Sequence, residues 1–167
     1  ALHNLSVRLT IGGGDLVCDI ETRRGRLVCA GFGWSPLDAV CIPFMHVDGR
    51  RFWTPQEEAV LSRLCKALLE APGPWQVGNQ NWNYDRQYFM ADPAFGFRPR
   101  CDFDTMIAQH LLLPGTPKDL AYLSSMYCAQ YRFWKEEGKE IEGEGDEARF
   151  VNYNWIDAVK TWEVCQV

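Results

Sequence analysis

Three short runs rich in Val, Ile, Cys and aromatic residues lie close together near the start of the chain, and no other feature constrains the fold as much. They cover residues 16–20, 26–34 and 39–44. Turn-forming residues separate them, with Arg24-Gly25 in the first gap and Ser35-Pro36 in the second. Short β-prone runs joined by such turns predict three sequential antiparallel strands.

After the third run, helix signals alternate with strand signals. Thr54, Pro55 and Glu57 have the pattern of an N-cap, a first helical residue and a capping box, and the Pro-Gly-Pro at residues 72–74 ends that helix. Strands first and then alternation predict an α/β fold, with a mixed five-stranded sheet flanked by helices. We expect the remaining strands at residues 75–78 and 100–103, helices from near Asn81, over residues 105–113, 119–128 and 132–137 and from Asp146 to the end, and an acidic loop at residues 138–145.

Length and composition fit one soluble domain over residues 1–167. The chain is 47% hydrophobic, enough for a full core, and it has no apolar run of the roughly 18 residues that a membrane span needs. No signal-peptide pattern opens it, so we expect a cytoplasmic location and no membrane partner. The seven cysteines contain no Cys-x-x-Cys pair, so they are expected to be reduced core residues rather than zinc ligands.

Two carboxylates, Asp19 and Glu21, lie two residues apart at the end of the first predicted strand. Side chains at i and i+2 of a strand leave the same face, so these two point the same way. Paired carboxylates beside a buried strand repel each other and are costly to desolvate, and divalent cations relieve both effects. The motif is short enough to arise by chance, and a solvated strand end is the alternative explanation.

A rarer motif follows the fourth predicted strand. Asn81, Tyr84 and Asp85 form Asn-x-x-Tyr-Asp, a pattern expected only about 0.01 times in a chain of this composition. Asp85 falls in the first turn of a helix, from which it would point towards the end of the first strand. The alternative is that Asn81 caps the helix and Asp85 complements its dipole.

Tyr153 and Asp157 lie four residues apart on the last predicted helix, so they share one face. An ordinary surface pair is the alternative. Trp155 and Trp162 project from the opposite side. We expect that side to cover another helix or to dock on a further domain.

In this order, the three motifs resemble those of the DEDDy exonucleases of the ribonuclease H-like superfamily. The sister group has a His five residues before the last Asp, where this chain has Asn152. We do not expect His3, His46 or His110 to take that part. Residue by residue, Asp19 and Glu21 match the first motif, Asn81, Tyr84 and Asp85 the second, and Tyr153 and Asp157 the third.

Further segments look like the exonuclease domain of A-family, DNA polymerase I-like enzymes. The resemblance implies a ribonuclease H-like fold and a polymerase domain C-terminal to this one, in a longer protein of a bacterium or a phage-infected cell. We therefore expect the chain to be a fragment. The segments are Asn83-Tyr84-Asp85-Arg86, Phe103-Asp104-Thr105-Met106 and residues 153–159, and residues 133–140 are similar to phage-type members.

The resemblance implies an exonuclease that releases nucleoside 5'-monophosphates from single-stranded or frayed DNA 3' ends, proofreading for a polymerase. It implies two Mg²⁺ ions, replaceable by Mn²⁺. Asp19 would bridge both ions, Glu21 and Asp157 would hold the ion that activates the attacking water, and Asp85 would hold the other. Tyr153 would orient the nucleophile, because a phenol with a pKa of about 10 is protonated at neutral pH. Substrate contacts are expected from Thr22, Asn81, Tyr84, Arg86 and Lys139.

The net charge of −5 does not exclude a nucleic-acid partner. Seven acids and two lysines lie within residues 135–147, and the remainder is balanced at 15 acids and 15 bases. Arg23, Arg24 and Arg26 lie near the first motif, where they could contact phosphates. Solvated turn residues are the equally simple explanation for these three arginines.

Two other functions fit the same motifs. A ribonuclease D-like or helicase-associated DEDDy exonuclease would use the same catalytic set on RNA or DNA ends. Contacts to the 2'-hydroxyl separate RNA from DNA, and the sequence does not reveal them. A nuclease-dead scaffold domain is the third possibility, although all five expected catalytic side chains are present.

Overall fold

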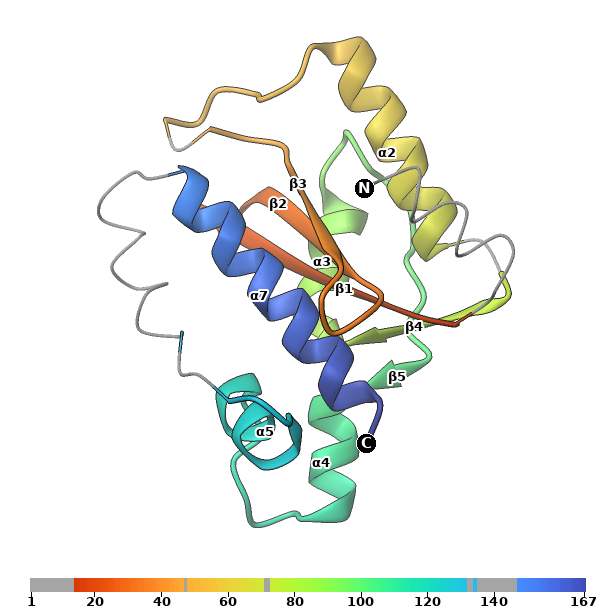
Figure 1. The fold of residues 1–167 in the computed structure, drawn as a ribbon. Coiled ribbons are helices and arrows are strands. Elements are labelled where there is room, and N and C mark those ends of the chain that lie inside the picture. Colours follow the sequence, from red (N-terminus) through yellow and green to blue (C-terminus); the bar gives the residue numbers. More distant parts are fainter. Residues whose placement is uncertain (1–13, 47, 71–72, 132–133, 135–146) are drawn as a thin grey trace.

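The computed structural model describes residues 14–46, 48–70, 73–131, 134 and 147–167. Their strands form one sheet in the order β3-β2-β1-β4-β5 (Figure 1). β1, β2 and β3 pair antiparallel, whereas β4 is parallel to β1 and β5 is parallel to β4. The predicted mixed sheet, with three antiparallel strands first, is confirmed. The strands are β1 (Gly14–Arg23), β2 (Arg26–Gly33), β3 (Ala39–Pro43), β4 (Trp75–Asn79) and β5 (Phe103–Asp104).

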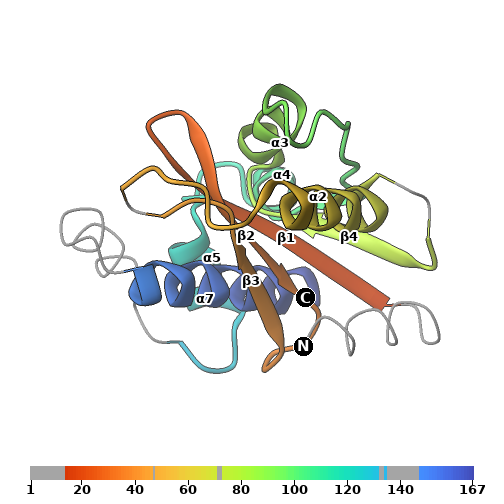
Figure 2. The same cartoon turned by 90° about the horizontal axis from the view of Figure 1, so that it is seen from above.

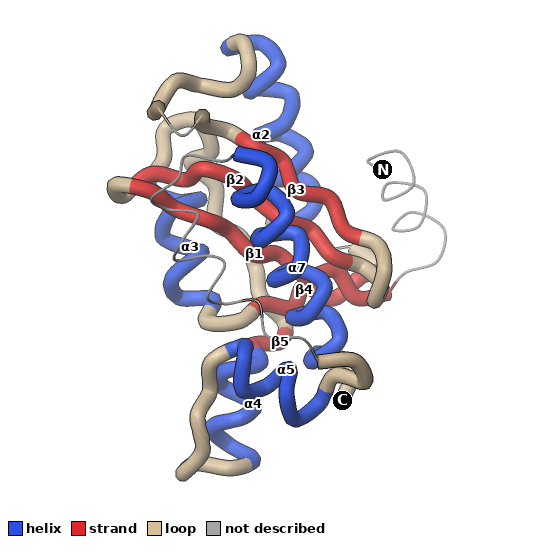
Figure 3. The backbone as a smooth tube through the Cα atoms, turned by 60° about the vertical axis from the view of Figure 1, so that its left-hand side comes forward, coloured by secondary structure: helices blue, strands red, loops and turns tan. Residues whose placement is uncertain are grey.

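Helices cover both faces of this sheet (Figure 2). One face carries α2 and α3, and α7 crosses the other, where it contacts β1, β2 and β3. Figure 3 shows α4 and α5 beside the β5 edge. The helices are α2 (Pro55–Leu69), α3 (Trp82–Ala91), α4 (Thr105–Leu112), α5 (Leu120–Tyr127) and α7 (Glu147–Cys165).

Local signals account for the start of α2 and for the β1–β2 turn. Thr54 accepts a hydrogen bond from the Glu57 N–H, and the Glu57 carboxylate accepts one from the Thr54 N–H, so the predicted capping box is present. Arg24 and Gly25 have φ values of 51° and 74°. Two left-handed residues are what a tight two-residue hairpin requires, and the predicted turn lies where it was expected.

The predicted strand at residues 100–103 is shorter and shifted, because only Phe103 and Asp104 pair with β4. Just before it, the Asp102 carboxylate accepts a hydrogen bond from the Val77 N–H at 2.8 Å, and the Asp102 N–H donates to the Val77 carbonyl. The Asp102 carboxylate thus accepts a hydrogen bond that a backbone carbonyl would accept in a regular pair of strands. The helix predicted over residues 132–137 and the acidic loop after it lie outside the described residues, apart from Trp134, which is not helical.

The apolar core lies on the face that α2 and α3 cover. Leu16, Cys18 and Ile20 alternate along β1 and pack there in one cluster with Phe32 and Leu68. Alternation places every second side chain of a strand on the same face. Three of the seven free cysteines are buried and four are half-buried, so the expected role in the core holds for some of them.

Two glycines let α7 approach the other face of the sheet. A Cβ atom at Gly31 would lie 2.5 Å from the Asn154 side-chain oxygen, and one at Gly33 would lie 2.8 Å from the Ala158 carbonyl oxygen. Both gaps are too short for a real side chain, so larger residues here would push α7 away. This close approach sets the depth at which α7 places its polar residues over β1.

The tryptophan side of α7 contacts strands. The Trp155 indole donates to the Ala39 carbonyl at 3.0 Å, and the Trp162 indole donates to the Asp15 carbonyl at 3.1 Å. The expectation of another helix on this side is therefore wrong, because the sheet occupies it; docking on a further domain stays a prediction. Among the described helices, none has the length and apolar character needed to cross a membrane.

Candidate active site

Three predicted metal ligands converge where α7 crosses β1. Asp19 and Glu21 come from β1 and Asp157 from α7, and one carboxylate oxygen from each lies within 4.8 Å of the others. Asp157 is buried, with 4% of its surface exposed, whereas Asp19 and Glu21 are half-buried. The sequence placed Asp19 and Glu21 on one face, and the packing of α7 adds the third acid.

Asp85 lies beside this group in the first turn of α3 and is buried. The Asn79 amide donates to its Oδ2 at 2.8 Å. Burial raises the pKa of Asp85 to about 8; the Asn79 hydrogen bond opposes this shift, and the charges of Asp104 and Asp157 add to it. Asp85 is not one of the three acids within 4.8 Å, yet it is near enough for the Asp157 charge to act on it. The raised pKa favours the protonated form of Asp85 when no cation is bound.

Neutral side chains orient the carboxylates. The Asn154 amide donates to Asp19 Oδ2 at 2.8 Å, and the Trp134 indole donates to Asp157 Oδ1 at 2.5 Å. Asn79 serves Asp85 in the same way. These donors hold the carboxylates without adding positive charge.

Sequence reasoning missed all three of these donors. Asn79 ends a buried strand and Asn154 follows Tyr153 in the third motif, so a polar residue at a position expected to be buried was an available signal. Trp134 had no such signal, because a buried tryptophan is ordinary in a core.

The ligand set fits a hard divalent cation. Carboxylate oxygens are the ligands that Mg²⁺ and Mn²⁺ prefer, and three converging acids have more negative charge than neutral donors can offset. Two further buried oxygens, Oδ1 of Asn79 and Oδ1 of Asn154, have no hydrogen-bond partner among the described residues. Both belong to side chains whose amide groups already serve carboxylates of the site.

Tyr153 lies one helical turn before Asp157 on α7, as predicted. Its ring is half-buried and packs against the cluster that contains Leu120, Leu123 and Trp134. Asn152, at the position where the sister group has its histidine, is exposed. The phenol is thus on the same side of α7 as the buried acid.

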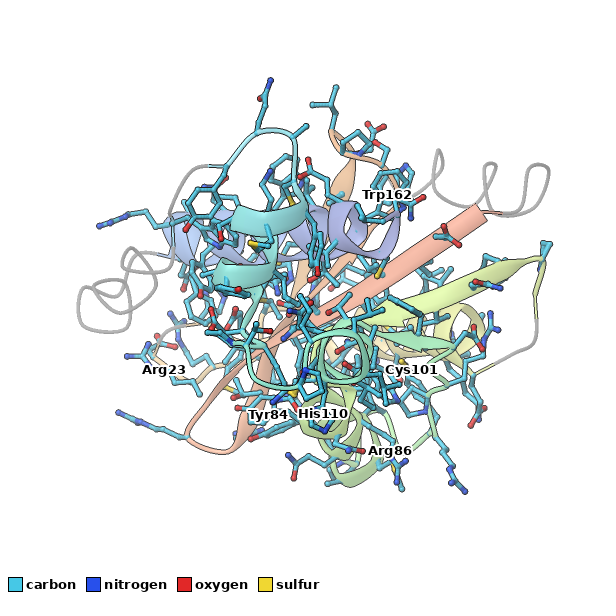
Figure 4. The ribbon with its side chains drawn as sticks, turned by 90° about the horizontal axis from the view of Figure 1, so that it is seen from below. Arg23, Tyr84, Arg86, Cys101, His110 and Trp162 are labelled. Carbon is cyan, nitrogen blue, oxygen red and sulfur yellow. The ribbon has the colours of Figure 1, made fainter. Side chains whose placement is uncertain are left out.

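The predicted substrate residues Thr22 and Tyr84 contact each other. Their hydroxyl oxygens lie 2.5 Å apart, which links the end of β1 to α3. Tyr84 is 41% exposed, and its ring lies against Tyr88 with centroids 5.2 Å apart. In the view of Figure 4, Arg23 and Arg86 lie to either side of Tyr84.

Asn81 is the N-cap of α3, but its side chain makes no capping hydrogen bond. The Asp104 carboxylate takes that part, because it accepts from the backbone N–H groups of Asn81 and Trp82 at 3.2 and 2.9 Å. The same carboxylate also caps α4. Asn81 is exposed with φ of 61°, so its side chain is available to a ligand. Lys139 lies outside the described residues.

The described histidines take no part in the acidic cluster. His46 bonds through Nδ1 to the Glu147 carboxylate at 2.7 Å and stacks on Phe52. His110 is exposed on α4. His3 lies outside the described residues.

No protein-family model matches the sequence, and no curated protein matches it. Solved structures do match the fold. The catalytic core of RRP6 from Trypanosoma brucei has a TM-score of 0.68 at 16% identity, and a structure described as the apo form of a nuclease has 0.69 at 15%. The EXO domain of Nibbler from Aedes aegypti has 0.66 at 13%.

These matches cover 98% of this chain in each case. They cover 42% of the RRP6 core, 73% of the nuclease and 81% of the EXO domain, so this chain spans less than half of the RRP6 core. At such low identity the likeness concerns the fold. With its five-stranded mixed sheet and flanking helices, the chain has the ribonuclease H-like fold that these structures share.

Proposed function

We propose that this chain is a metal-dependent 3'–5' exonuclease domain of the DEDDy type. The observation that carries the proposal is the convergence of Asp19, Glu21 and Asp157 within 4.8 Å, with the buried Asp85 beside them. The fold adds support, because similar structures are described as a catalytic core, a nuclease and an EXO domain. Acids that β1 and α7 bring together on this fold fit phosphodiester hydrolysis.

The roles of the residues follow from their positions. Asp19, Glu21 and Asp157 would hold divalent cations, whose chemistry would be to lower the pKa of a water nucleophile and to neutralise charge on the leaving oxygen. Asp85 would join this set as an ionised carboxylate, with its proton released to solvent. Tyr153 would orient the attacking water through its hydroxyl, because it shares the Asp157 side of α7. The product is a nucleoside 5'-monophosphate.

For the substrate we propose the single-stranded or frayed 3' end of DNA, in the service of a polymerase domain in a longer protein. The resemblance of the motifs to A-family polymerases supports this. The half-exposed Tyr84, beside Tyr88 and bonded to Thr22, offers an aromatic surface on which a terminal base can stack.

A ribonuclease D-like activity is the second candidate, and it is at least as well supported. Of the three similar structures, one is described as a nuclease and one as an EXO domain, and none as a polymerase domain. The catalytic set would be unchanged, and only the sugar contacts would differ.

The test is to incubate 5'-labelled single-stranded DNA and RNA of the same sequence with the chain and Mg²⁺. We expect a ladder that shortens from the 3' end, and we expect Asp19→Asn or a chelator to abolish it. Asp38→Asn removes a carboxylate in the exposed turn between β2 and β3, so it is the matched control and should leave the ladder intact.

Faster shortening of RNA than of DNA would favour the ribonuclease D-like activity over polymerase proofreading. Endonucleolytic fragments, or activity that persists in Asp19→Asn, would contradict the proposed site. No shortening of either strand at high protein concentration would favour a nuclease-dead scaffold.

A further inference from the structure

We infer that Trp134 is a positioning residue of this site, whose indole N–H fixes the orientation of the Asp157 carboxylate for a divalent cation. The inference rests on the proposed function, because it assigns to Asp157 the part of a metal ligand. It concerns a residue outside all three sequence motifs, from the connection between α5 and α7.

The contact is a direct hydrogen bond from the indole N–H to a carboxylate oxygen. The indole Nε1 lies 2.5 Å from Asp157 Oδ1. Trp134 is 2% exposed and Asp157 is 4% exposed, so water does not compete for this bond. A carboxylate held through one oxygen in a buried setting does not rotate freely about its Cβ–Cγ bond.

The indole nitrogen is itself held in place by packing. The Trp134 ring belongs to a cluster with Leu120 and Leu123 of α5 and Val164 of α7, and Tyr131 lies at its edge with ring centroids 6.5 Å apart. Anchoring of a donor by apolar neighbours on two helices is what a positioning role requires. Tyr153 packs on the same cluster, so one set of contacts steadies both residues of the third motif.

The chemistry of the donor suits a cation site. Indole has one N–H and no acceptor, and it is neutral at every relevant pH. A Lys or Arg in its place would also hold Asp157, but its charge would repel the incoming cation. Partners that orient metal-binding side chains in this way commonly change metal affinity by 10- to 100-fold when they are replaced.

The experiment measures Mn²⁺ affinity by calorimetry on the metal-free chain, with no nucleic acid present. Trp134→Phe keeps an aromatic ring but loses the N–H, and we expect it to weaken Mn²⁺ binding by about 10- to 100-fold. Trp162→Phe is the matched control. It also removes one indole hydrogen bond, 3.1 Å long, from a half-buried tryptophan on the sheet side of α7, and it should bind Mn²⁺ like the wild type.

Tryptophan emission gives a second readout that does not depend on catalysis. Paramagnetic Mn²⁺ bound beside Asp157 should quench Trp134, so part of the wild-type quenching should be missing in Trp134→Phe and present in Trp162→Phe. Equal Mn²⁺ affinity and equal quenching in the two variants would overturn the inference.

A third measurement applies if Trp134→Phe does not fold. In the intact chain, the indole N–H resonance that moves in Asp157→Asn should also move when Mg²⁺ is added. An indole resonance that responds to Asp157→Asn but is unaffected by saturating Mg²⁺ would overturn the inference.

The inference and the proposed function fail in different ways. If the wild type binds Mn²⁺ and shortens 3' ends while Trp134→Phe binds as tightly as the control, the inference is wrong and the function stands. If Trp134→Phe binds Mn²⁺ more weakly but no nucleic acid is degraded, the inference stands and the exonuclease proposal is wrong. A wild-type chain that binds no Mn²⁺ would overturn both.

Discussion

The two faces of β1 carry different kinds of side chain. Leu16, Cys18 and Ile20 point into the apolar cluster under α2 and α3. The intervening positions, with Asp19 and Glu21, face α7. Because strand side chains alternate, a single strand supplies both a core face and a site face.

The helices that pack on these two faces also differ in the kind of side chain that they bury. α2 contributes Cys65, Leu68 and Leu69 to the apolar cluster. α7 buries Asn154 and Asp157, and the strand opposite Asn154 has no side chain at Gly31. Apolar burial stabilises the α2 layer, whereas the α7 layer buries polar groups beside apolar ones. The larger apolar cluster thus lies on the face under α2 and α3, whereas the face under α7 carries Asp19, Glu21 and Asp157, and Asp85 comes from α3.

The largest effect is expected from Phe32→Ala, which tests whether the two faces of the sheet act independently. Phe32 is fully buried in the α2 layer, so the substitution should lower the free energy of unfolding by about 3 to 5 kcal/mol. Urea unfolding measures the loss. Below the transition, the folded fraction should bind Mn²⁺ normally, and weakened binding there would show that the two faces are coupled.

The candidate site should also make stability depend on pH, through Asp85 of α3. Its folded pKa is about 8 and its ordinary value is 3.8, so between these values the folded chain holds a proton that the unfolded chain releases. The stabilisation is complete below about pH 4 and is lost as pH rises towards 8, by on the order of a few kcal/mol. Urea unfolding in chelator at pH 5 and pH 8 checks this.

Asp85→Asn should remove this dependence of the unfolding free energy on pH, and it should make the metal-free chain more stable at pH 8. Mg²⁺ should also restore stability at pH 8, because it binds the ionised form. If the free energy of unfolding of Asp85→Asn still falls between pH 5 and pH 8, another group is responsible for the pH dependence.

A smaller effect is expected from Gly31→Ala. The new Cβ would lie 2.5 Å from the Asn154 oxygen, so Asn154 must move and its hydrogen bond to Asp19 must weaken. Overpacking of this kind costs about 1 to 3 kcal/mol. Unlike Phe32→Ala, this change should also reduce exonuclease kcat in the folded fraction. Unchanged kcat would show that Asn154 does not position Asp19.

The smallest effect is expected at the β1–β2 hairpin, beyond the site end of β1. Arg24 is exposed in the turn, and if it contacts a substrate phosphate, Arg24→Gln should lower the slope of log affinity against log salt by about 1. Filter binding of a single-stranded oligonucleotide in chelator measures this slope. Arg63→Gln, in the exposed part of α2, is the control and should leave the slope unchanged.

Much of the fold could be predicted because its signals are local. The strand alternation, the Thr54–Glu57 capping box and the Arg24-Gly25 turn each act within a few residues. The shift of the fifth strand to Phe103 was not predictable, because the Asp102 carboxylate bonds to Val77 on another strand. Side-chain substitution for a ladder hydrogen bond leaves no trace in hydrophobic periodicity.

The candidate site can likewise be divided into features that arise within one element and features that depend on contacts between elements. The sequence by itself determined that Asp19 and Glu21 share one face of a strand and that Tyr153 and Asp157 share one face of a helix, because periods of 2 and 3.6 act within one element. It also placed Asp85 in the first turn of a helix. Only the tertiary structure decided that these faces meet within 4.8 Å, that Asp104 caps α3, and that Trp134 holds Asp157. Contacts between elements distant in sequence depend on how closely the elements pack, and here α7 lies close to β2 because Gly31 has no side chain to exclude it.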